Sequence, residues 1–397
     1  MRPVTELASW ISRSLISAST TAVNSHARPW TPLLEQTLHG LGCRDSLTPS
    51  LVARVIDPHL LSHHSLALGF FNWAAQQPGF AHDSASYRSI FKSLSTSRQS
   101  IASVVESLLR QVKAQSLALD SLTCGFVIKT LLQGKMIRKA VLVFDEMMKS
   151  GGSSIEPDVC NSLLAALCSE GSLENALKVF EKMAERKVGF SSVGFGVFIW
   201  RLCRDYELGK VLSLLDRVQS DGQSSIDGSI IALLVVDGLC QVSRVEEALW
   251  ALTELRIRHC KPDFMAYRIV AEAFRTTGSV VDVNIVLKMK RKLGVAPRSE
   301  FLLSSKLLRG LTYDVAHPDS HVILLKCLAE AKESRIAGEH VKWIRETSPS
   351  MSRTVTSQIS ASPLSSTEPD LLQQFAWAMP ADQCGVDVMD RGNICSM

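Results

Sequence analysis

Aromatic residues and long apolar runs are both scarce in this sequence of 397 residues. Phe, Trp and Tyr together make up 6%, with only 4 Tyr, although 46% of the residues are hydrophobic. Strands favour aromatic and β-branched side chains, so this composition disfavours an all-β sandwich and favours helices packed on helices. The most apolar stretch, 230–236, ends at Asp237 and is far shorter than the ~20 residues of a membrane-spanning helix. We therefore expect a sizeable core and no membrane partner.

The sequence also lacks the motifs of metal sites and of common enzymes. None of its 10 cysteines forms a CxxC pair, which argues against the usual zinc frameworks and the zinc-deaminase signature. It contains no phosphate-binding loop, no GxGxxG turn, no HExxH helix and no GxSxG elbow. The formal net charge of +4 permits a polyanionic partner without requiring one. We expect a protein that is not an enzyme and that has no cofactor and no metal site.

Three of the cysteines point to an internal repeat. Cys168, Cys203 and Cys240 are 35 and 37 residues apart, and we expect them to be small buried core residues at one repeat position. Anchor residues recur at intervals of 36, 35, 37 and 35 residues: Ala140, Ala176, Val211, Ala248 and Val283. Two more columns keep the same register: Leu131, Leu167, Leu202, Leu239 and Phe274, and then Ile137, Leu173, Leu208, Val245 and Val280. Three columns in register establish a repeat over residues 120–290.

Each repeat contains two helical patterns. In the second repeat, apolar residues at helical spacing run from Leu163 to Cys168 and end at a turn signal around Gly171. A second apolar pattern follows, in which the small Ala176 allows two helices to approach closely. Pro157 lies between two units, where proline ends one helix and begins the next. One hairpin cannot bury its own apolar face, so we predict an all-α fold, an α-solenoid (superhelix) of stacked helix-turn-helix repeats of about 35 residues.

These repeats resemble those of a known family. The second unit has Asn-Ser-Leu-Leu at 161–164, Leu-Cys at 167–168 and an Ala-to-Phe segment at 176–180, and residues 235–249 match the same motif more closely. On these residues the chain resembles a pentatricopeptide repeat protein of the P type. Residues 67–80 resemble the N-terminal repeats of land-plant members. The resemblance covers roughly residues 50–312.

The resemblance implies binding of single-stranded RNA. Members of the family read one base per repeat with a few side chains, at the fifth and last residues of each repeat. In the second repeat these residues are Asn161 and Ser191, a pair that by resemblance favours a pyrimidine. Asp263 is the last residue of a later repeat. Gly125 and Gly196 offer no side chain at the fifth position. The resemblance therefore implies that only a few repeats of this chain carry side chains able to read a base.

Four cations are candidates for contacts with the RNA backbone. Arg268 and Arg298 occupy both reading positions of the fifth unit, and Lys288 and Lys290 lie in a basic run. Each candidate also has a simpler interpretation. The arginines could be solvated surface residues, the lysines could form the polar face and last turn of a helix, and Asn161 could cap a helix.

The N-terminal segment has a different composition. Residues 1–30 contain three arginines, many Ser and Thr, and Glu6 as the single acidic residue. Leu7, Ile11 and Leu15 give a basic helix an apolar stripe. This composition is typical of an organellar transit peptide, which we expect to be disordered and to direct the chain to the mitochondrion, with the chloroplast as the alternative. An ordinary frayed terminus is the competing interpretation.

The rest of the chain divides by how well it keeps the repeat. We expect degenerate N-terminal repeats over 50–119, the repeat array over 120–312, degenerate terminal helices over 313–345 and a disordered tail over 346–397. Between Thr347 and Thr367, 12 of 21 residues are Ser or Thr, too polar a composition to offset the entropy of ordering. The abrupt loss of the pattern suggests a truncated or alternatively spliced product.

Two functional classes follow from these features. The first is a monomeric protein that binds single-stranded organellar RNA without catalysis, with RNA-processing proteins as further partners. The alternative is a protein-interaction solenoid that acts as a scaffold in the organelle. Contacts with phosphate weaken steeply as salt rises, whereas an apolar peptide groove does not respond in this way, so salt dependence separates the two.

Overall fold

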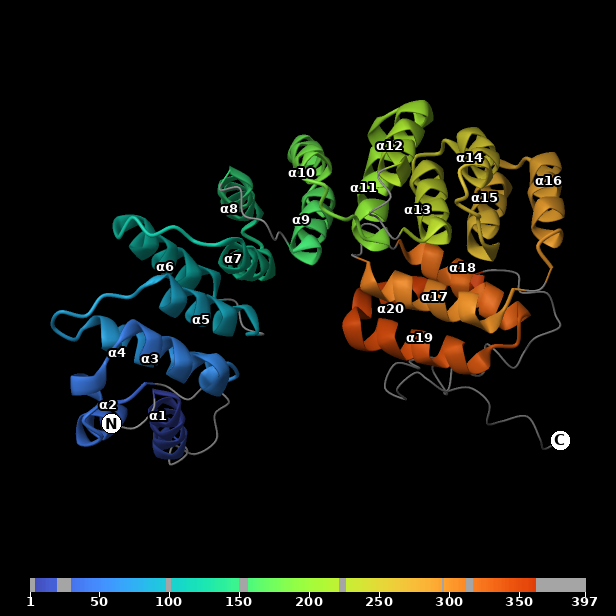
Figure 1. Cartoon of the computed structure of the whole chain (residues 1–397). Helices are drawn as coiled ribbons and strands as arrows, with labels where there is room; N and C mark the ends of the chain where they lie inside the picture. The colour runs from blue at the N-terminus through green and yellow to red at the C-terminus, as the bar shows by residue number, and fades with distance from the viewer. Residues whose placement is uncertain are drawn as a thin grey trace, which may run out of the picture. The chain divides into compact units, whose positions relative to one another are not determined.

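The computed structural model describes residues 4–19, 30–97, 101–149, 156–220, 226–294, 296–311 and 317–361 (Figure 1). These residues form twenty α-helices, two short helices of other types and no strands, which confirms the predicted all-α class. The α-helices are α1 (Val4–Ser19), α2 (Pro32–Gly40), α3 (Pro49–Arg54), α4 (His64–Ala75), α5 (Ser84–Ser95), α6 (Ala102–Ala114), α7 (Ser121–Gln133), α8 (Ile137–Lys149), α9 (Pro157–Ser169), α10 (Leu173–Glu185), α11 (Ser192–Asp205), α12 (Leu208–Ser220), α13 (Gly228–Gln241), α14 (Val245–Ile257), α15 (Phe264–Thr277), α16 (Val280–Arg291), α17 (Arg298–Gly310), α18 (Pro318–Glu330), α19 (Ser334–Thr347) and α20 (Pro349–Ala361). The short ones are η1 (Cys43–Ser46) and η2 (Val55–Leu60). Among the described helices, none has both the length and the apolar character needed to span a membrane.

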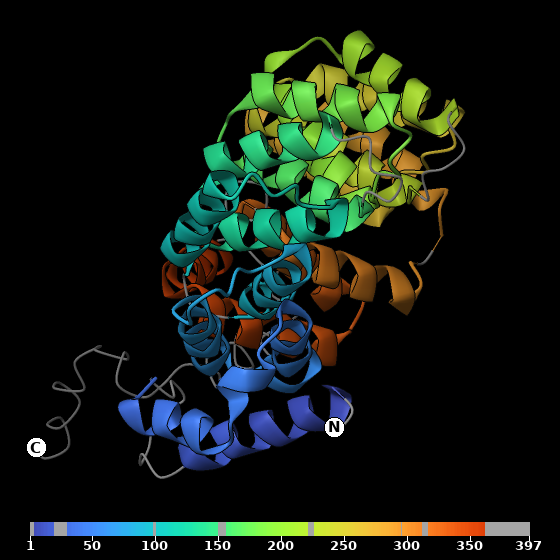
Figure 2. The same ribbon diagram turned by 60° about the vertical axis from the view of Figure 1, so that its left-hand side comes forward.

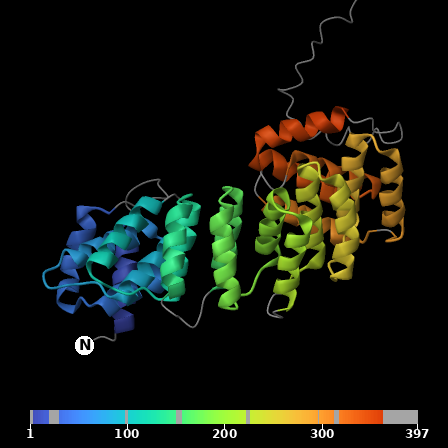
Figure 3. The ribbon, with the colours of Figure 1, turned by 90° about the horizontal axis from the view of Figure 1, so that it is seen from above.

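The chain forms two compact units. Unit 1 comprises Met1–Phe195 and Val218–Ser225, and unit 2 comprises Gly196–Arg217 and Ile226–Met397. The helices of unit 1 follow one another in chain order (Figure 2), and within each unit the repeat helices stand side by side (Figure 3). The division passes through α11 and α12, although the sequence repeat continues through both helices.

The predicted repeat is confirmed as a series of stacked hairpins, the arrangement of an α-solenoid. Helices α7–α8, α9–α10, α13–α14 and α15–α16 pair as hairpins, and the first helix of one hairpin packs on the first helix of the next, as α7 does on α9. The column residues at the end of each first helix are at most 4% exposed: Leu131, Leu167, Leu202, Leu239 and Phe274. The alanine anchors Ala140, Ala176 and Ala248 are fully buried. Burial of both columns explains why the sequence keeps them in register.

A left-handed residue closes the turn between the two helices of a hairpin. It lies four positions after the column residue and has φ between 56° and 82° in Lys135, Gly171, Ser243, Gly278 and Lys332. In each turn the next N–H donates to the carbonyl of the column residue over 2.8–3.1 Å. This hydrogen bond satisfies a carbonyl that the helix end leaves free. Because Lys332 follows the buried Leu328 in the same way, α18 and α19 form one more hairpin of this type.

The N-terminal segment is helical and packed, which differs from the disorder expected over residues 1–30. Helix α1 contacts α2, α3 and η2, and its residues Ala8, Ile11 and Leu15 are at most 1% exposed. The predicted apolar stripe is therefore present, but it is covered by the first helices of unit 1. Residues 20–29 of the expected transit peptide lie outside the described part of the chain.

The predicted disorder of 346–397 is wrong for its first part. Residues 349–361 form α20, which packs on α18 and α19 and buries Met351, Val355 and Ile359. These three apolar residues are spaced four apart, and hydroxyls of the helix bond to its own carbonyls, as Thr356 Oγ1 does to Ser352 O at 2.8 Å. The high Ser and Thr content therefore conceals a helical period. Residues 362–397 lie outside the described part.

Candidate nucleic-acid interface

The first helix of each hairpin carries the predicted reading positions. We number the residues of each repeat so that the buried column residue near the end of its first helix is residue 11. With Leu167 as residue 11, Asn161 is residue 5 of its repeat and the fifth residue of α9. The same register applies to α5, where Leu94 is buried at the eleventh position. We call the fifth and ninth positions of these helices the first-helix face.

The structure brings Asn161 and Ser191 together. Asn161 Oδ1 accepts a hydrogen bond from the Ser191 backbone N–H at 2.9 Å. Asn161 Nδ2 donates to the carbonyls of Pro157 at 2.8 Å and Gly189 at 3.0 Å. The Ser191 hydroxyl accepts from the Gly194 N–H at 3.0 Å. Asn161 is 5% exposed, so its amide joins α9 to the loop that precedes α11, and both of its donors are occupied.

The glycines at the fifth position lie where successive first helices meet. A Cβ on Gly125 of α7 would meet Val159 of α9 at 3.5 Å, and one on Gly196 of α11 would meet Leu234 of α13 at 2.5 Å. The missing side chain therefore serves helix packing at Gly196, whereas the 3.5 Å contact at Gly125 is an ordinary van der Waals distance. This position is poor in base-reading groups because it is also a helix contact.

Asp263, the third predicted reader, caps helix α15. Its Oδ1 accepts a hydrogen bond from the Ala266 N–H at 3.0 Å, which satisfies one of the free donors of the helix start. Burial of the carboxyl raises the pKa of Asp263 to about 6, and the negative charge of Glu300 adds to the shift. The cap and the desolvation both favour a structural role for this side chain.

The two predicted backbone-contacting arginines are engaged with carboxylates. Arg268 Nη2 lies 2.5 Å from Glu330 Oε1, and the Arg268 side chain is only 14% exposed. Arg298 Nε lies 3.4 Å from Glu333 Oε2. Phosphate contact by either arginine would require these pairs to open. Arg268 is therefore a largely buried ion-paired residue, whereas Arg298, at 55% exposure, is an ion-paired surface residue.

Lys288 and Lys290 belong to the last turn of α16, together with Arg291. Since α16 is a second helix, these lysines are not on the first-helix face. A cation in the last turn of a helix is stabilised by the partial negative charge of the free carbonyls there. Their position agrees with the simpler interpretation of this basic run.

Three other cations lie on the first-helix face of unit 1. Arg88 and Lys92 are the fifth and ninth residues of α5, and Lys129 is the ninth residue of α7. Arg88 pairs with Asp120, and Lys92 Nζ lies 2.7 Å from Asp57 Oδ2. Lys129 is exposed and forms no ion pair with any residue that the structure describes. Extending the leucine column upstream to Leu94 would have identified this register from the sequence.

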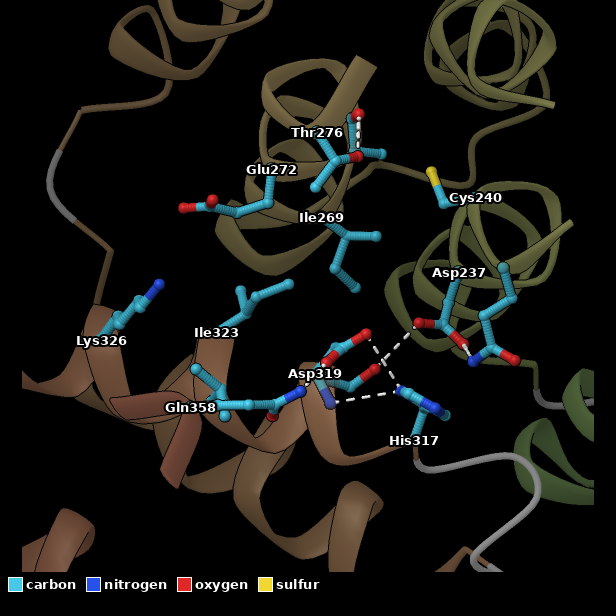
Figure 4. Close-up of a pocket in the computed structure, with 14 residues that line it drawn as sticks. Asp237, Cys240, Ile269, Glu272, Thr276, His317, Asp319, Ile323, Lys326 and Gln358 are labelled. Atoms are coloured by element: carbon cyan, nitrogen blue, oxygen red, sulfur yellow. Dashed lines mark hydrogen bonds and ion pairs between the residues drawn. The ribbon is translucent and has the colours of Figure 1, made fainter. Parts of the chain in front are cut away.

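In unit 2 the first-helix face is polar and partly covered. A cavity of about 500 Å³ opens between α13, α15, α18 and α20 (Figure 4). Asp237, at the ninth position of α13, accepts hydrogen bonds from Trp200 Nε1 at 3.0 Å, Gln241 Nε2 at 2.7 Å and Ser320 Oγ at 2.9 Å. Burial raises the pKa of Asp237 to about 6.

Two of the three cysteines of the repeat lie in the core, as predicted, whereas Cys240 lines the cavity. Cys168 and Cys203 are buried and Cys240 is half-buried, and burial raises the pKa of the Cys203 thiol to about 12. A thiol with such a raised pKa is a poor metal ligand and a poor nucleophile at neutral pH. Over the described ranges, no group of three or more His, Cys, Asp or Glu side chains is placed to hold a metal ion.

Comparisons with known proteins bear on these repeats. Residues 123–152 and 158–188 match the family model described as PPR repeat. The chain is 54% identical over 299 residues to pentatricopeptide repeat-containing protein At5g14080 of Arabidopsis thaliana, a match that covers 75% of this chain and 46% of that protein. It is 28% identical over 176 residues to the Arabidopsis thaliana protein At3g22670, mitochondrial, covering 44% of this chain and 31% of that protein.

A solved structure also resembles the chain. The pentatricopeptide repeat protein PPR10, in complex with an 18-nt psaJ RNA element, aligns with a TM-score of 0.44 and 17% identity, over 90% of this chain and 53% of that one. The chain spans less than half of the length of the two Arabidopsis relatives. The matched repeats, the buried columns that define them and the identity to the Arabidopsis relatives show that the chain belongs to the pentatricopeptide repeat family.

Proposed function

We propose that the first-helix face of unit 1 binds single-stranded RNA. In this proposal Lys129 contacts a phosphate, and the Asn161–Ser191 pair contacts a base. The observation that carries it is Lys129, an exposed cation on a first helix that is not neutralised by any described carboxylate. Release of counterions from neutralised phosphates supplies most of the affinity in such binding.

The Asn161–Ser191 pair retains groups that a base could use. Asn161 Oδ1 accepts one hydrogen bond and has a second lone pair, and the Ser191 hydroxyl accepts one bond and keeps its own hydrogen to donate. A neighbouring acceptor and donor complement the Watson–Crick edge of an unstacked base. Base contact through these atoms leaves the bonds of Asn161 Nδ2 intact.

We further propose that the RNA is an organellar transcript. Several of the Arabidopsis relatives are labelled mitochondrial, and residues 1–30 have the composition of an import signal. A bound repeat array acts without catalysis, by shielding a single-stranded site during RNA processing, splicing, stabilisation or translation.

The test is a comparison of two lysine variants of the full chain. Lys129→Gln removes the exposed cation of α7, and Lys178→Gln removes an exposed lysine of α10, a second helix of the same unit. Fluorescence anisotropy with labelled oligouridine and oligocytidine should show that Lys129→Gln raises Kd roughly fivefold, equivalent to about 1 kcal/mol. Lys178→Gln should leave Kd nearly unchanged. Equal effects of the two variants, or no binding by the unmodified chain, would refute the proposal.

A further inference from the structure

Helix α18 lies across first helices of its own unit. At its N-terminal end, Ser320 Oγ donates to Asp237 Oδ1 of α13 at 2.9 Å, and both residues are buried. At its C-terminal end, Glu330 pairs with Arg268 of α15 at 2.5 Å. The close-up in Figure 4 shows α18 facing α13 and α15 across the cavity that Asp237, Glu272 and Lys326 line. One helix therefore contacts two successive first helices.

The contacts of α18 fall on the repeat positions that matter for the proposed function. Arg268 and Glu272 are the fifth and ninth residues of the α15 repeat, and Asp237 is the ninth residue of the α13 repeat. Lys129, the proposed phosphate contact of unit 1, is also a ninth residue. In unit 2 these positions face a helix of the same chain, whereas Lys129 in unit 1 is exposed.

The chemistry of the contact is that of a phosphate substitute. Glu330 offers its carboxylate oxygens to the Arg268 guanidinium, and Glu333 offers its own to Arg298 at 3.4 Å. Carboxylate and phosphate oxygens form the same kind of charge-assisted hydrogen bond with a guanidinium. A strand of RNA that approached α15 would therefore compete with Glu330 for Arg268.

Helix α18 is held in place by packing of the neighbouring helices and by the ion pair between Glu330 and Arg268, which is open to solvent. Phe301 of α17 packs on Phe264 of α15 with ring centres 4.4 Å apart and ring planes tilted by 51°, and Gln358 of α20 donates to Asp319 of α18 at 2.7 Å. In contrast, Glu330 is 52% exposed, so water and salt can weaken its attraction to Arg268. The C-terminal end of α18 is the end at which displacement can begin.

We propose that α18 is an autoinhibitory element, which occupies the first-helix face of α13 and α15 and must be displaced before RNA contacts these two helices. The inference rests on the proposed function. In this inference Arg268 belongs to a hidden phosphate-binding site, and the carboxylate of Glu330 masks that site.

The central test compares two charge-equivalent variants of the full chain. Arg268 pairs with Glu330 and, at 3.5 Å, with Glu272 of its own helix, and Glu330→Gln removes the nearer of these two carboxylates. Glu339→Gln removes a carboxylate of similar exposure from α19, where it pairs with Arg335. With labelled oligouridine and oligocytidine at fixed salt, Glu330→Gln should lower Kd at least roughly fivefold. Glu339→Gln should change Kd little, which controls for the general effect of a lost negative charge. Equal changes in the two variants would overturn the inference.

Two further measurements separate unmasking from general electrostatics. Arg268→Gln, combined with Glu330→Gln, should abolish the gain that Glu330→Gln gives alone, because the gain depends on the released guanidinium. Hydrogen exchange of the full chain should become faster over 318–330 when RNA is added. Unchanged or slower exchange there, or a gain that survives Arg268→Gln, would contradict the role of α18.

The outcomes distinguish this inference from the proposed function. If the unmodified chain binds RNA through Lys129 and the Glu330 and Glu339 variants behave alike, the masking role fails and the function stands. If neither the unmodified chain nor Glu330→Gln binds RNA, both fail.

Discussion

Gly238 lets α13 approach the backbone of α11 closely. A Cβ on Gly238 would lie 2.7 Å from the backbone carbonyl oxygen of Trp200, which cannot move without shifting α11. Gly238→Ala should therefore lower the free energy of unfolding by about 1–3 kcal/mol, although alanine is otherwise the better helix former. In Gly209→Ala, the control in α12, the new Cβ meets nothing within 4 Å. Urea unfolding should show no loss for Gly209→Ala, and equal losses in the two variants would contradict the packing argument.

The residues of the predicted interface show how far sequence reasoning reaches. The repeat register places Asn161 and Ser191 at the reading positions, and the structure joins them through a hydrogen bond. The register does not reveal that Asn161 Nδ2 is bonded to Gly189 O, because that bond depends on the path of a loop. It also does not reveal Glu330, which follows its partner Arg268 by 62 residues and lies beyond the regular columns.

At the scale of the helix, α1 combines the composition of an import signal with a place in the core of unit 1. Ile11 is fully buried against the neighbouring helices, so Ile11→Ala should lower the free energy of unfolding by about 2–4 kcal/mol. Thr5→Ala, on the exposed side of the same helix, should have little effect. Thermal unfolding of both variants measures the difference, and equal melting temperatures would show that α1 is not packed in solution.

Helices α1 and α20 were missed as packed elements for the same physical reason. Composition predicts whether a segment can bury enough apolar surface on its own, and both segments are rich in Ser and Thr. Each presents only three or four apolar residues at helical spacing, and each is ordered because neighbouring helices cover that stripe. Such tertiary support cannot be read from the segment alone.

The C-terminal hairpin contains a buried pair of histidines that should respond to pH. His340 Nδ1 lies 2.9 Å from Ser305 Oγ and its Nε2 lies 2.9 Å from His321 Nδ1. Burial, with the nearby charges of His321 and Arg309, lowers the pKa of His340 to about 3, from the usual value near 6.5. The unfolded chain therefore binds more protons, and the stability that the neutral imidazole contributes is complete above pH 6.5 and is lost as the pH falls toward 3.

This loss is best measured as a difference between two proteins. Compared with His340→Gln, the unmodified chain should lose about 2 kcal/mol of unfolding free energy between pH 7 and pH 5. The difference is needed because Asp237 and Asp263, with pKa values raised to about 6, act in the opposite direction as they become protonated in this range. Parallel stability curves for the two proteins would show that His340 keeps an ordinary pKa.

For the whole molecule, the fold class and the register of the repeats could be predicted, because each repeat buries the column residue of its first helix and most also bury the anchor of the second, with Val283 half-buried. The division into two units could not be predicted, since the interval of 35 residues between Leu167 and Leu202 continues through α11, where the units are separated. The two units also differ on their first-helix faces. Lys92 and Lys129 lie on that of unit 1, whereas Asp237 and Glu272 lie on that of unit 2 and α18 contacts it.

The most direct test of the account is the salt dependence of RNA binding by the full chain. The logarithm of the association constant for oligouridine should fall linearly with the logarithm of the salt concentration, with a slope of about −0.7 for each phosphate that is neutralised. Lys129→Gln should make that slope shallower by the contribution of about one neutralised phosphate, and Lys178→Gln should leave the slope unchanged. A slope near zero, or one that both variants change equally, would contradict RNA binding by the first-helix face of unit 1.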